Sequence, residues 1–351
     1  MKIHKRVLVI ATSTNTRGGI SAVIKAHEES LFWKEWNCIW VETHIDKSFL
    51  IKIYYFIKSF IKFLHLVNKA SLIHCHLSGP ISAMRKLPFL IIAKLMSIPI
   101  IIHFHAFSAE SHIPKNHIKF YNIFFGMADK IIVLSENWKE GILKDFKYDA
   151  NKVKVIYNPC PNIVPDTSLE QKKTILYAGT LNERKGYNDL IKAFSKIAHN
   201  YSDWKLVFAG NGEIEKGKAL AKKYKIYDQV VFKGWVSGKE KQILFNEASI
   251  FCLPSYAEGF PMAVLDAWAY GLPVISTPVG GIPDIAINGE NMLLCEPGDI
   301  LCLENNLRLL IEDKKLQTKL IKASKNFSIG KFSIESISKD WNKLYNNLLN
   351  I

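Results

Sequence analysis

Two carboxylates eight residues apart are the side chains best placed for chemistry in this chain. Glu258 lies in a glycine loop, and Asp266 lies two turns into the helix expected after it, where Pro261 suits the first turn. Eight residues rise by about 12 Å along a helix axis, which is too far for a close acid–base pair. The spacing therefore predicts that the two carboxylates hold separate parts of one elongated ligand.

A cationic loop precedes this segment in the chain. Arg184 and Lys185 lie between Gly179 and Gly186, directly after a strand-like run at 174–178. Two adjacent cations at the carboxyl end of a strand are suited to binding a diphosphate. A basic turn exposed to solvent is the alternative.

Two more glycine loops follow strand-like runs. Gly18 and Gly19 end the first loop of the chain, and Gly210 and Gly212 flank Asn211 after the run at 205–209. A glycine pair ahead of a helix lets the backbone approach a phosphate closely. The first loop has neither the G-x-G-x-x-G fingerprint nor a P-loop lysine, which disfavours dinucleotide and P-loop sites. A tight structural turn is the alternative for both loops.

The elements that must position these loops alternate between strand and helix, as in parallel α/β proteins. Three prolines between Pro159 and Pro165 indicate a linker. We therefore expect two Rossmann-like, doubly wound parallel-sheet domains facing a cleft, with ligands beyond the carboxyl ends of the strands. The expected strands are 6–10, 72–75, 99–103, 130–134 and 153–156, then 174–178, 205–209, 230–232, 250–253, 273–276 and 292–294.

The segment 332–349 is predicted to be an amphipathic helix. Its large apolar residues recur at helical spacing, so it must pack on another part of the protein. These residues are Trp341, Leu344, Tyr345 and Leu348.

The charge of the chain is strongly uneven. The net charge is +14, of which residues 1–165 carry +11 and residues 166–351 carry +3. A basic half suggests an anionic partner, but only five of the 46 basic residues are Arg, the residue preferred for reading bases. We therefore expect no nucleic-acid partner and consider a membrane surface instead.

The segment 51–69 could meet such a surface. On a helical projection Lys58, Lys62 and Lys69 form one stripe, and apolar and aromatic residues crowd the remaining arc. This pattern favours a helix at an anionic membrane interface. The alternative is that the apolar face packs on the domain's own sheet.

The cysteines and apolar stretches indicate where the protein resides. The six cysteines have no Cys-x-x-Cys spacing, so we expect reduced thiols. The apolar run at 7–10 is too short for a signal peptide, and the run at 89–107 is interrupted by charged residues, proline and histidines. We expect a cytoplasmic protein, or one peripheral on the inner face of the membrane.

The order and spacing of these motifs resemble one enzyme family over nearly the whole chain. The segment from Glu258 to Ile275 resembles the E-x7-E signature of the family-4 retaining glycosyltransferases, and the segment 277–281 continues the likeness. The resemblance implies the two-domain GT-B fold. It implies an acceptor-binding domain at 1–160, a nucleotide-sugar donor domain at 161–330, and a C-terminal helix at 331–351 that packs back on the first domain.

The resemblance also implies roles for individual residues. Lys185 would stabilise the donor diphosphate, Glu258 would bind sugar hydroxyls, and His105 would face the transferred sugar. Asp266 would bind the ribose, and the segment 233–236 would border the base. The donor-binding residues implied in this way are Gly19, Arg184, Gly210, Asn211, Lys233, Val236, Gly259, Phe260, Met262 and Asp266.

Two positions depart from the family pattern. The family has Glu where this chain has Asp266, which is one methylene shorter. The family also has Arg after the first glycine of the cationic loop, where this chain has Thr180. The missing charge must then come from Arg184 or Arg17, or the diphosphate is held less firmly.

The function implied is hexosyl or N-acetylhexosaminyl transfer from a nucleotide sugar, a UDP-sugar rather than a GDP-sugar. The acceptor would be a glycan or lipid-linked molecule of cell-surface polysaccharide synthesis. No cofactor or metal is expected, because the family works without one and the chain has no Asp-x-Asp.

Three other functions are weighed against this one. A sugar-nucleotide epimerase of the same fold would release free nucleotide without an acceptor. A zinc-dependent hydrolase could use the pairs His74/His76 and His103/His105, each on one face of a strand, but no carboxylate accompanies them at matching spacing. A basic protein that only binds membrane or nucleic acid would leave the motifs of the second half unused.

Overall fold

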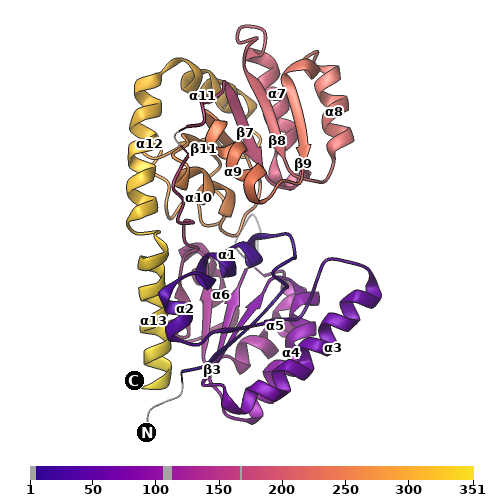
Figure 1. Ribbon diagram of the computed structural model, residues 1–351, viewed down its shortest axis with the longest axis vertical. Coiled ribbons are helices and arrows are strands. Elements are labelled where there is room, and N and C mark those ends of the chain that lie inside the picture. Colours follow the sequence, from indigo (N-terminus) through magenta and orange to yellow (C-terminus); the bar gives the residue numbers. More distant parts are fainter. Residues whose placement is uncertain (1–4, 106–112, 167) are drawn as a thin grey trace. The chain divides into compact units, whose positions relative to one another are not determined.

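The computed structural model describes residues 5–105, 113–166 and 168–351. The chain forms two compact units (Figure 1). The N-terminal unit comprises the chain up to Pro159 together with Ile334–Ile351, and the C-terminal unit comprises Cys160–Ser333.

The N-terminal unit is built on a parallel sheet with strand order β2-β1-β3-β4-β5-β6. All five expected strands form within two residues of their predicted bounds. The strand β2 was missed, because Trp36-Asn37-Cys38 before it gives no clear strand signal and it is only four residues long. The strands are β1 Val7–Ala11, β2 Ile39–Glu42, β3 Leu72–Leu77, β4 Ile100–Phe104, β5 Lys130–Val133 and β6 Val153–Val155.

Helices cover both faces of this sheet, so the doubly wound prediction is confirmed. One core contains Phe63 from α3 and Phe89 from α4, and the core on the opposite face contains Ile24 from α1 and Trp36 after α2. The helices are α1 Gly19–Glu28, α2 Leu31–Glu35, α3 Phe49–Leu66, α4 Pro80–Leu95, α5 Lys115–Met127, α6 Glu136–Phe146 and α13 Ile334–Leu349.

The C-terminal helix α13 belongs to the N-terminal unit although the whole C-terminal unit separates them in sequence. Its buried residues Trp341, Leu344 and Tyr345 join the core formed with α1 and α2. The indole of Trp36 donates a hydrogen bond to Asn342 Oδ1 at 2.8 Å. The apolar stripe of the predicted helix is therefore the face that is buried.

The C-terminal unit repeats the architecture with strand order β12-β11-β10-β7-β8-β9, again parallel. Its strands are β7 Thr174–Ala178, β8 Lys205–Ala209, β9 Val230–Gly234, β10 Ile250–Leu253, β11 Val274–Ser276 and β12 Leu293–Leu294. Its helices are α7 Tyr187–Ile197, α8 Ile214–Lys223, α9 Gly238–Glu247, α10 Met262–Ala269, α11 Ile300–Glu312 and α12 Lys314–Ile329.

This strand order places a topological switch point between β7 and β10. The chain runs outward from β7 through β8 to β9 on one side, and from β10 through β11 to β12 on the other. The loops after β7 and β10 therefore leave the sheet side by side in opposite directions, which is where open α/β sheets bind ligands.

Helix α3 agrees only in part with the alternative that its apolar face packs on the sheet, since Phe63 is in the core and Phe56, Phe60 and Leu66 pack against it. Only Ser59 and Phe63 of its 18 residues are buried, so most of its apolar side chains do not pack on the sheet. Phe49 is 75% exposed, and the other large side chains left open are Leu50, Ile51, Ile53, Tyr54, Ile57, Ile61 and Leu64. Within the described residues, no helix is long and apolar enough to span a bilayer. All six cysteines are free thiols, as expected.

Candidate active site

Glu258 and Lys185 meet at the switch point of the C-terminal unit. Lys185 Nζ lies 2.5 Å from Glu258 Oε1, and the Ser255 hydroxyl donates to the same oxygen at 2.7 Å. Arg184 Nη1 lies 3.8 Å from Glu258 Oε2. Glu258 is only 6% exposed, so its charge is taken out of water and compensated by two cations.

Two glycines hold the loops that carry these groups in close contact. Gly186 has φ +68°, and a Cβ there would lie 1.9 Å from the Pro254 carbonyl oxygen. Gly280 has φ +61°, and a Cβ there would lie 2.3 Å from the carbonyl oxygen of Glu258. Any side chain at either position would displace the backbone that positions Glu258. Sequence reasoning had placed Gly280 in the family motif without giving it this role.

Backbone hydrogen bonds join the same two loops. Tyr256 N–H donates to the Arg184 carbonyl at 2.7 Å, and Arg184 Nη1 donates to the Ala257 carbonyl at 2.5 Å. Arg184 is therefore held against the β10 loop beside Glu258. Thr180, which replaces the family's arginine, is exposed and accepts a hydrogen bond from Tyr177 at its carbonyl.

Asp266 lies on the second turn of α10 and has a cationic partner that the sequence analysis missed. Lys241 on α9 places its Nζ 2.6 Å from Asp266 Oδ2. Burial raises the pKa of Asp266 above its ordinary value, and the charge and hydrogen bond of Lys241 act in the opposite direction. The helix begins at Met262, with Pro261 immediately before it, so helical rise does not set the distance between the two carboxylates.

The start of α10 supplies hydrogen-bond donors rather than side chains. No side chain caps this helix, so first-turn N–H groups such as that of Met262 can meet an anion. The Phe260 ring is 5% exposed and packs toward Phe332. Of the predicted residues here, Gly259 and Phe260 can therefore offer only backbone groups.

The other predicted donor residues of the C-terminal unit lie on neighbouring loops. A Cβ at Gly210 would lie 1.8 Å from the Gly179 carbonyl oxygen, and Asn211 accepts the Leu181 N–H at 2.6 Å. These residues thus fix the β7 and β8 loops against each other, as a structural turn would. Lys233 is exposed on β9 and Val236 is buried. Among the described residues, the hydrogen bonds and salt bridges of the Glu258 and Asp266 side chains involve neither of them.

In the N-terminal unit, Gly19 begins α1 and is exposed. Gly18 precedes it with φ +146°, and no side chain caps this helix. Glu42 holds the preceding loop by accepting hydrogen bonds from Ser13 and from the backbone and hydroxyl of Thr14. Partial burial raises the pKa of Glu42, but these hydrogen bonds outweigh it and the pKa is lowered.

His105 follows β4 and joins a stack of histidines. Its Nε2 lies 2.8 Å from His76 Nδ1, and its ring centroid lies 4.0 Å from that of His103. Burial, with a smaller contribution from Lys86, lowers the pKa of His105 to about 3. Burial also lowers the pKa values of His74, His76 and His103 well below their ordinary value, so these imidazoles are uncharged at neutral pH.

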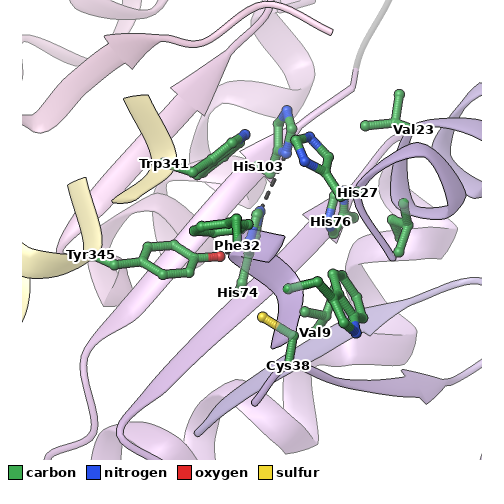
Figure 2. A pocket seen from close by; sticks show the side chains of 12 residues that line it. Val9, Val23, His27, Phe32, Cys38, His74, His76, His103, Trp341 and Tyr345 are labelled. Atoms are coloured by element: carbon green, nitrogen blue, oxygen red, sulfur yellow. Dashed lines mark hydrogen bonds between the residues drawn. The ribbon is translucent and has the colours of Figure 1, made fainter. Parts of the chain in front are cut away.

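His74, His76 and His103 line a cavity under α13 (Figure 2). It is also lined by Trp341, Tyr345 and Cys38. The sequence analysis placed each pair on one strand face, and the register of β3 with β4 pairs His76 with His103. The structure thus brings together His74, His76 and His103, three of the four side chains of the zinc-hydrolase alternative, without a carboxylate in the group.

Comparison with protein families gives two adjoining matches. The family described as "Glycosyltransferase Family 4" matches residues 35–161, and "Glycosyl transferases group 1" matches residues 162–327. The boundary between the matches falls within two residues of the boundary between the compact units.

Curated relatives match over part of their length. An uncharacterized glycosyltransferase of Haemophilus influenzae is 34% identical over 61% of this chain and 60% of that protein. The capsular polysaccharide biosynthesis glycosyltransferase CapM of Staphylococcus aureus is 28% identical over 63% of this chain and 56% of that protein. This chain thus matches about 60% of the length of these two relatives.

Solved structures match over the whole chain. HepE of Anabaena, in complex with UDP and glucose, superposes with a TM-score of 0.81, covering 98% of this chain and 100% of that chain at 15% identity. At this identity the likeness establishes the shared GT-B fold.

Proposed function

The chain belongs to the glycosyltransferases of group 1 and family 4, and we propose that it is a retaining enzyme of cell-surface polysaccharide synthesis. It moves a hexosyl or N-acetylhexosaminyl group from a UDP-sugar to a glycan or lipid-linked acceptor. The choice of UDP is supported by HepE, a protein of the same fold that binds UDP and glucose. The polysaccharide role is supported by the relative CapM, named for capsular polysaccharide biosynthesis.

The observation that carries this proposal is the arrangement of Lys185 and Arg184 around the buried Glu258 at the switch point of the C-terminal unit. In this arrangement the two cations compensate the carboxylate. A diphosphate brings two or more negative charges to the same loops, so the cations exchange part of their contact with Glu258 for phosphate oxygens. The Glu258 carboxylate is then able to accept hydrogen bonds from sugar hydroxyls.

The transfer step requires stabilisation of a leaving diphosphate. The bond from the sugar C1 to the β-phosphate oxygen breaks, the acceptor oxygen bonds to C1 from the same face, and the acceptor proton passes to the departing phosphate oxygen. Lys185, Arg184 and the uncapped start of α10 stabilise the charge that develops on that oxygen. The proposed step uses no metal. The role that the family resemblance implies for His105, contact with the transferred sugar, stays a prediction.

Asp266 binds the ribose hydroxyls in this proposal. Its Oδ2 is bound to Lys241, which opposes the rise in pKa that burial causes and fixes the orientation of the carboxylate. The remaining carboxylate oxygen accepts hydrogen bonds from the ribose. Lys241 of α9 thus fixes the orientation of the Asp266 side chain, which is one methylene shorter than the family's glutamate.

The two carboxylates should differ in what they recognise. We expect Asp266→Ala to weaken binding of free UDP at least tenfold, because the ribose loses its acceptor. Glu258→Ala should leave UDP affinity within about threefold and reduce sugar recognition and turnover. Calorimetry with UDP, GDP and ADP measures this for the full chain. If Glu258→Ala weakens the binding of UDP as much as Asp266→Ala does, the assignment of Asp266 to the ribose and Glu258 to the sugar is wrong.

Helix α3 supports association of the N-terminal unit with an anionic membrane. At about 100° per residue, the exposed residues from Ile53 to Leu64 form one apolar stripe. Lys58 and Lys62 lie beside this stripe and are exposed. An exposed apolar face bordered by lysines is suited to a bilayer interface, where it can receive a lipid-linked acceptor. The protein would then act at the inner face of the membrane.

Changing Lys58, Lys62 and Lys69 to Glu should abolish binding to anionic vesicles, because each lysine contributes about 1 kcal/mol at such a surface. Co-sedimentation with vesicles of phosphatidylglycerol and phosphatidylcholine measures the effect. The matched control changes Lys222, Lys223 and Lys225 of the C-terminal unit to Glu and should retain binding. Equal binding to neutral and anionic vesicles would contradict membrane association of this kind.

A further inference from the structure

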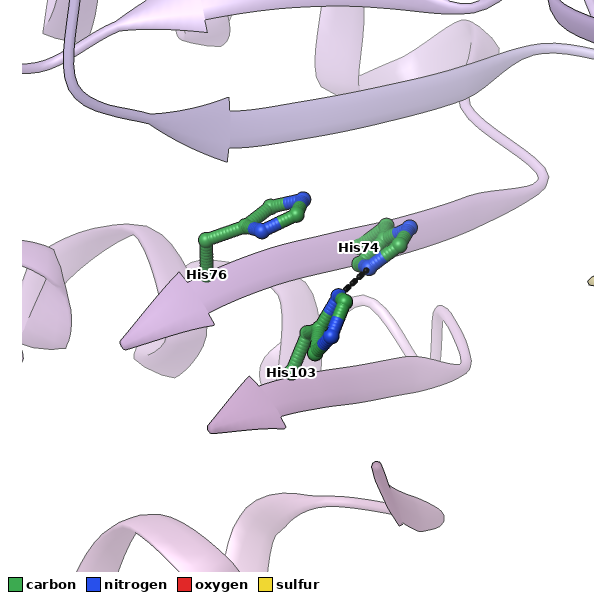
Figure 3. Close-up of side chains that lie close together, drawn as sticks. All are labelled: His74, His76 and His103. Atoms are coloured by element: carbon green, nitrogen blue, oxygen red, sulfur yellow. Dashed lines mark hydrogen bonds between the residues drawn. The ribbon is translucent and has the colours of Figure 1, made fainter. Parts of the chain in front are cut away.

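Three buried imidazoles converge between β3 and β4 of the N-terminal unit (Figure 3). His74, His76 and His103 each offer a ring nitrogen that lies within 4.8 Å of one from both others. All three side chains are buried, and none is required to bind the donor in the function proposed above. Imidazole is the commonest neutral metal ligand in proteins.

The hydrogen bonds of the cluster occupy both ring nitrogens of His74 and one ring nitrogen each of His76 and His103. His74 uses Nδ1 with the Tyr345 hydroxyl at 2.6 Å, and His76 uses Nδ1 with His105 Nε2 at 2.8 Å. His103 Nδ1 lies 3.3 Å from His74 Nε2, while His103 Nε2 is buried without a partner among the described residues. A metal ion held by His74 Nε2 and His103 Nδ1 would replace the contact between these two nitrogens.

The cluster faces a cavity that can hold a single small species. The cavity has a volume of about 20 Å³, and its wall includes the three histidines (Figure 2). A volume above roughly 10–15 Å³ holds one water molecule or an ion of similar size. An ion in this cavity would not displace side chains of the surrounding core.

We propose that His74, His76 and His103 bind one divalent transition-metal ion, with Zn²⁺ as the ion that fits them best. Zn²⁺ takes imidazole nitrogens at about 2.0–2.1 Å in tetrahedral geometry. Hard cations such as Mg²⁺ and Ca²⁺ are disfavoured, because they prefer oxygen ligands and no carboxylate belongs to the group.

The separations fit this ion after small ring movements. Two nitrogens bound to a tetrahedral Zn²⁺ lie about 3.3 Å apart, and His74 Nε2 and His103 Nδ1 are already 3.3 Å apart. His74 and His76 stack with an interplanar angle of 14°, so their rings must turn to point at one ion. The terminal torsion of histidine is broad enough to allow this turn.

The surrounding groups act as outer-shell partners of the proposed ligands. A hydroxyl can donate or accept, so Tyr345 satisfies His74 Nδ1 in either tautomer. His105 plays the same part for His76. Such partners fix the orientation of metal-binding imidazoles. The ion would tie β3 to β4 beneath α13, next to His105.

A cobalt titration of the untagged full chain, first dialysed against a chelator, tests this site. Co²⁺ in a tetrahedral histidine site absorbs visible light, so we expect a saturating absorbance at one ion per chain, displaced by an equivalent of Zn²⁺. We also expect Zn²⁺ to raise the melting temperature of the N-terminal unit. A wild-type chain that takes up no ion at micromolar free metal contradicts the proposal.

Variants locate the ion. His103→Gln keeps a polar side chain of similar size and should reduce cobalt uptake at least tenfold, while the exposed His199→Gln and His65→Gln should retain one ion per chain. Equal uptake by His103→Gln, in a chain shown by circular dichroism to be folded, places the ion elsewhere and overturns the proposal. Donor binding is measured in parallel, since its loss would bear on the proposed transferase function and not on this site.

Discussion

Replacing Lys185 by alanine should lower the rate of sugar transfer by about a hundredfold, or on the order of 3 kcal/mol in the transition state. The substitution removes the cation closest to Glu258 and, in the proposed mechanism, to the leaving diphosphate. Arg184 remains, but its Nη1 is 3.8 Å from Glu258 and already donates to the Ala257 carbonyl. Arg184 therefore cannot fully replace the lost charge.

The measurement is the release of nucleoside diphosphate at saturating donor. The donor is the sugar nucleotide that most raises the melting temperature of the wild-type chain. Lys218→Ala is the control, because it removes a lysine that pairs with Glu215 at the surface of α8. Turnover by Lys185→Ala equal to that of the control would contradict the proposed role of this lysine.

Trp341→Ala should lower the free energy of unfolding of the N-terminal unit by about 3–5 kcal/mol. Trp341 is 2% exposed, and its ring centroid lies 4.6 Å from that of His74 and 5.1 Å from that of His103. Removing the indole opens a large cavity between α13 and the sheet. The melting temperature of this unit should fall by roughly 10 °C.

Scanning calorimetry measures this loss, and the C-terminal unit serves as an internal reference. Lys339→Ala changes an exposed position of the same helix and should alter the unfolding free energy by less than about 0.5 kcal/mol. A loss below about 1 kcal/mol for Trp341→Ala would mean that α13 contributes little to the stability of the N-terminal unit.

The regular elements of this fold were readable from the sequence because each strand is a short β-branched run bounded by turn residues. The strands β7, β8 and β10 form at their predicted residues. The stripe of Trp341 and Tyr345 predicted that the last helix is buried on one side. It could not identify the partner, since Trp36 and His74 lie some 270 residues or more away in sequence and no local pattern encodes that contact.

The sequence predicted the loops that form the candidate site, because strand ends and glycines place them. It did not predict the contacts that depend on a single side chain. The glycine loops and the family resemblance assign Lys185 and Glu258 to one donor molecule. That the two side chains meet follows from the pairing of β7 with β10, which the structure shows. The pairing of Lys241 with Asp266 carries no such signal, because many lysines recur on exposed helices of this chain. The contact of Gly280 with the Glu258 carbonyl depends on the three-dimensional path of a third loop.

The exposure of α3 was also beyond the sequence. Its apolar residues exceed what one buried helix face needs, but periodicity does not reveal how much of that surface the sheet covers. Helix α3 uses Phe63 and partly Phe56 and Phe60 against the core and leaves Ile57 and Ile61 each 51% exposed. The extra apolar surface is the feature that the membrane proposal explains.

The central claim is that the paired loops after β7 and β10 bind the diphosphate of a nucleotide sugar. Phosphorus NMR tests this claim most directly, by titration of UDP, GDP and ADP with the wild-type chain and with Lys185→Ala and Lys218→Ala. We predict that at least one nucleotide shows shifted phosphorus resonances with the wild type and Lys218→Ala, and that these shifts are largely lost with Lys185→Ala. No shift with any of the three nucleotides, or equal shifts with Lys185→Ala, would contradict the claim.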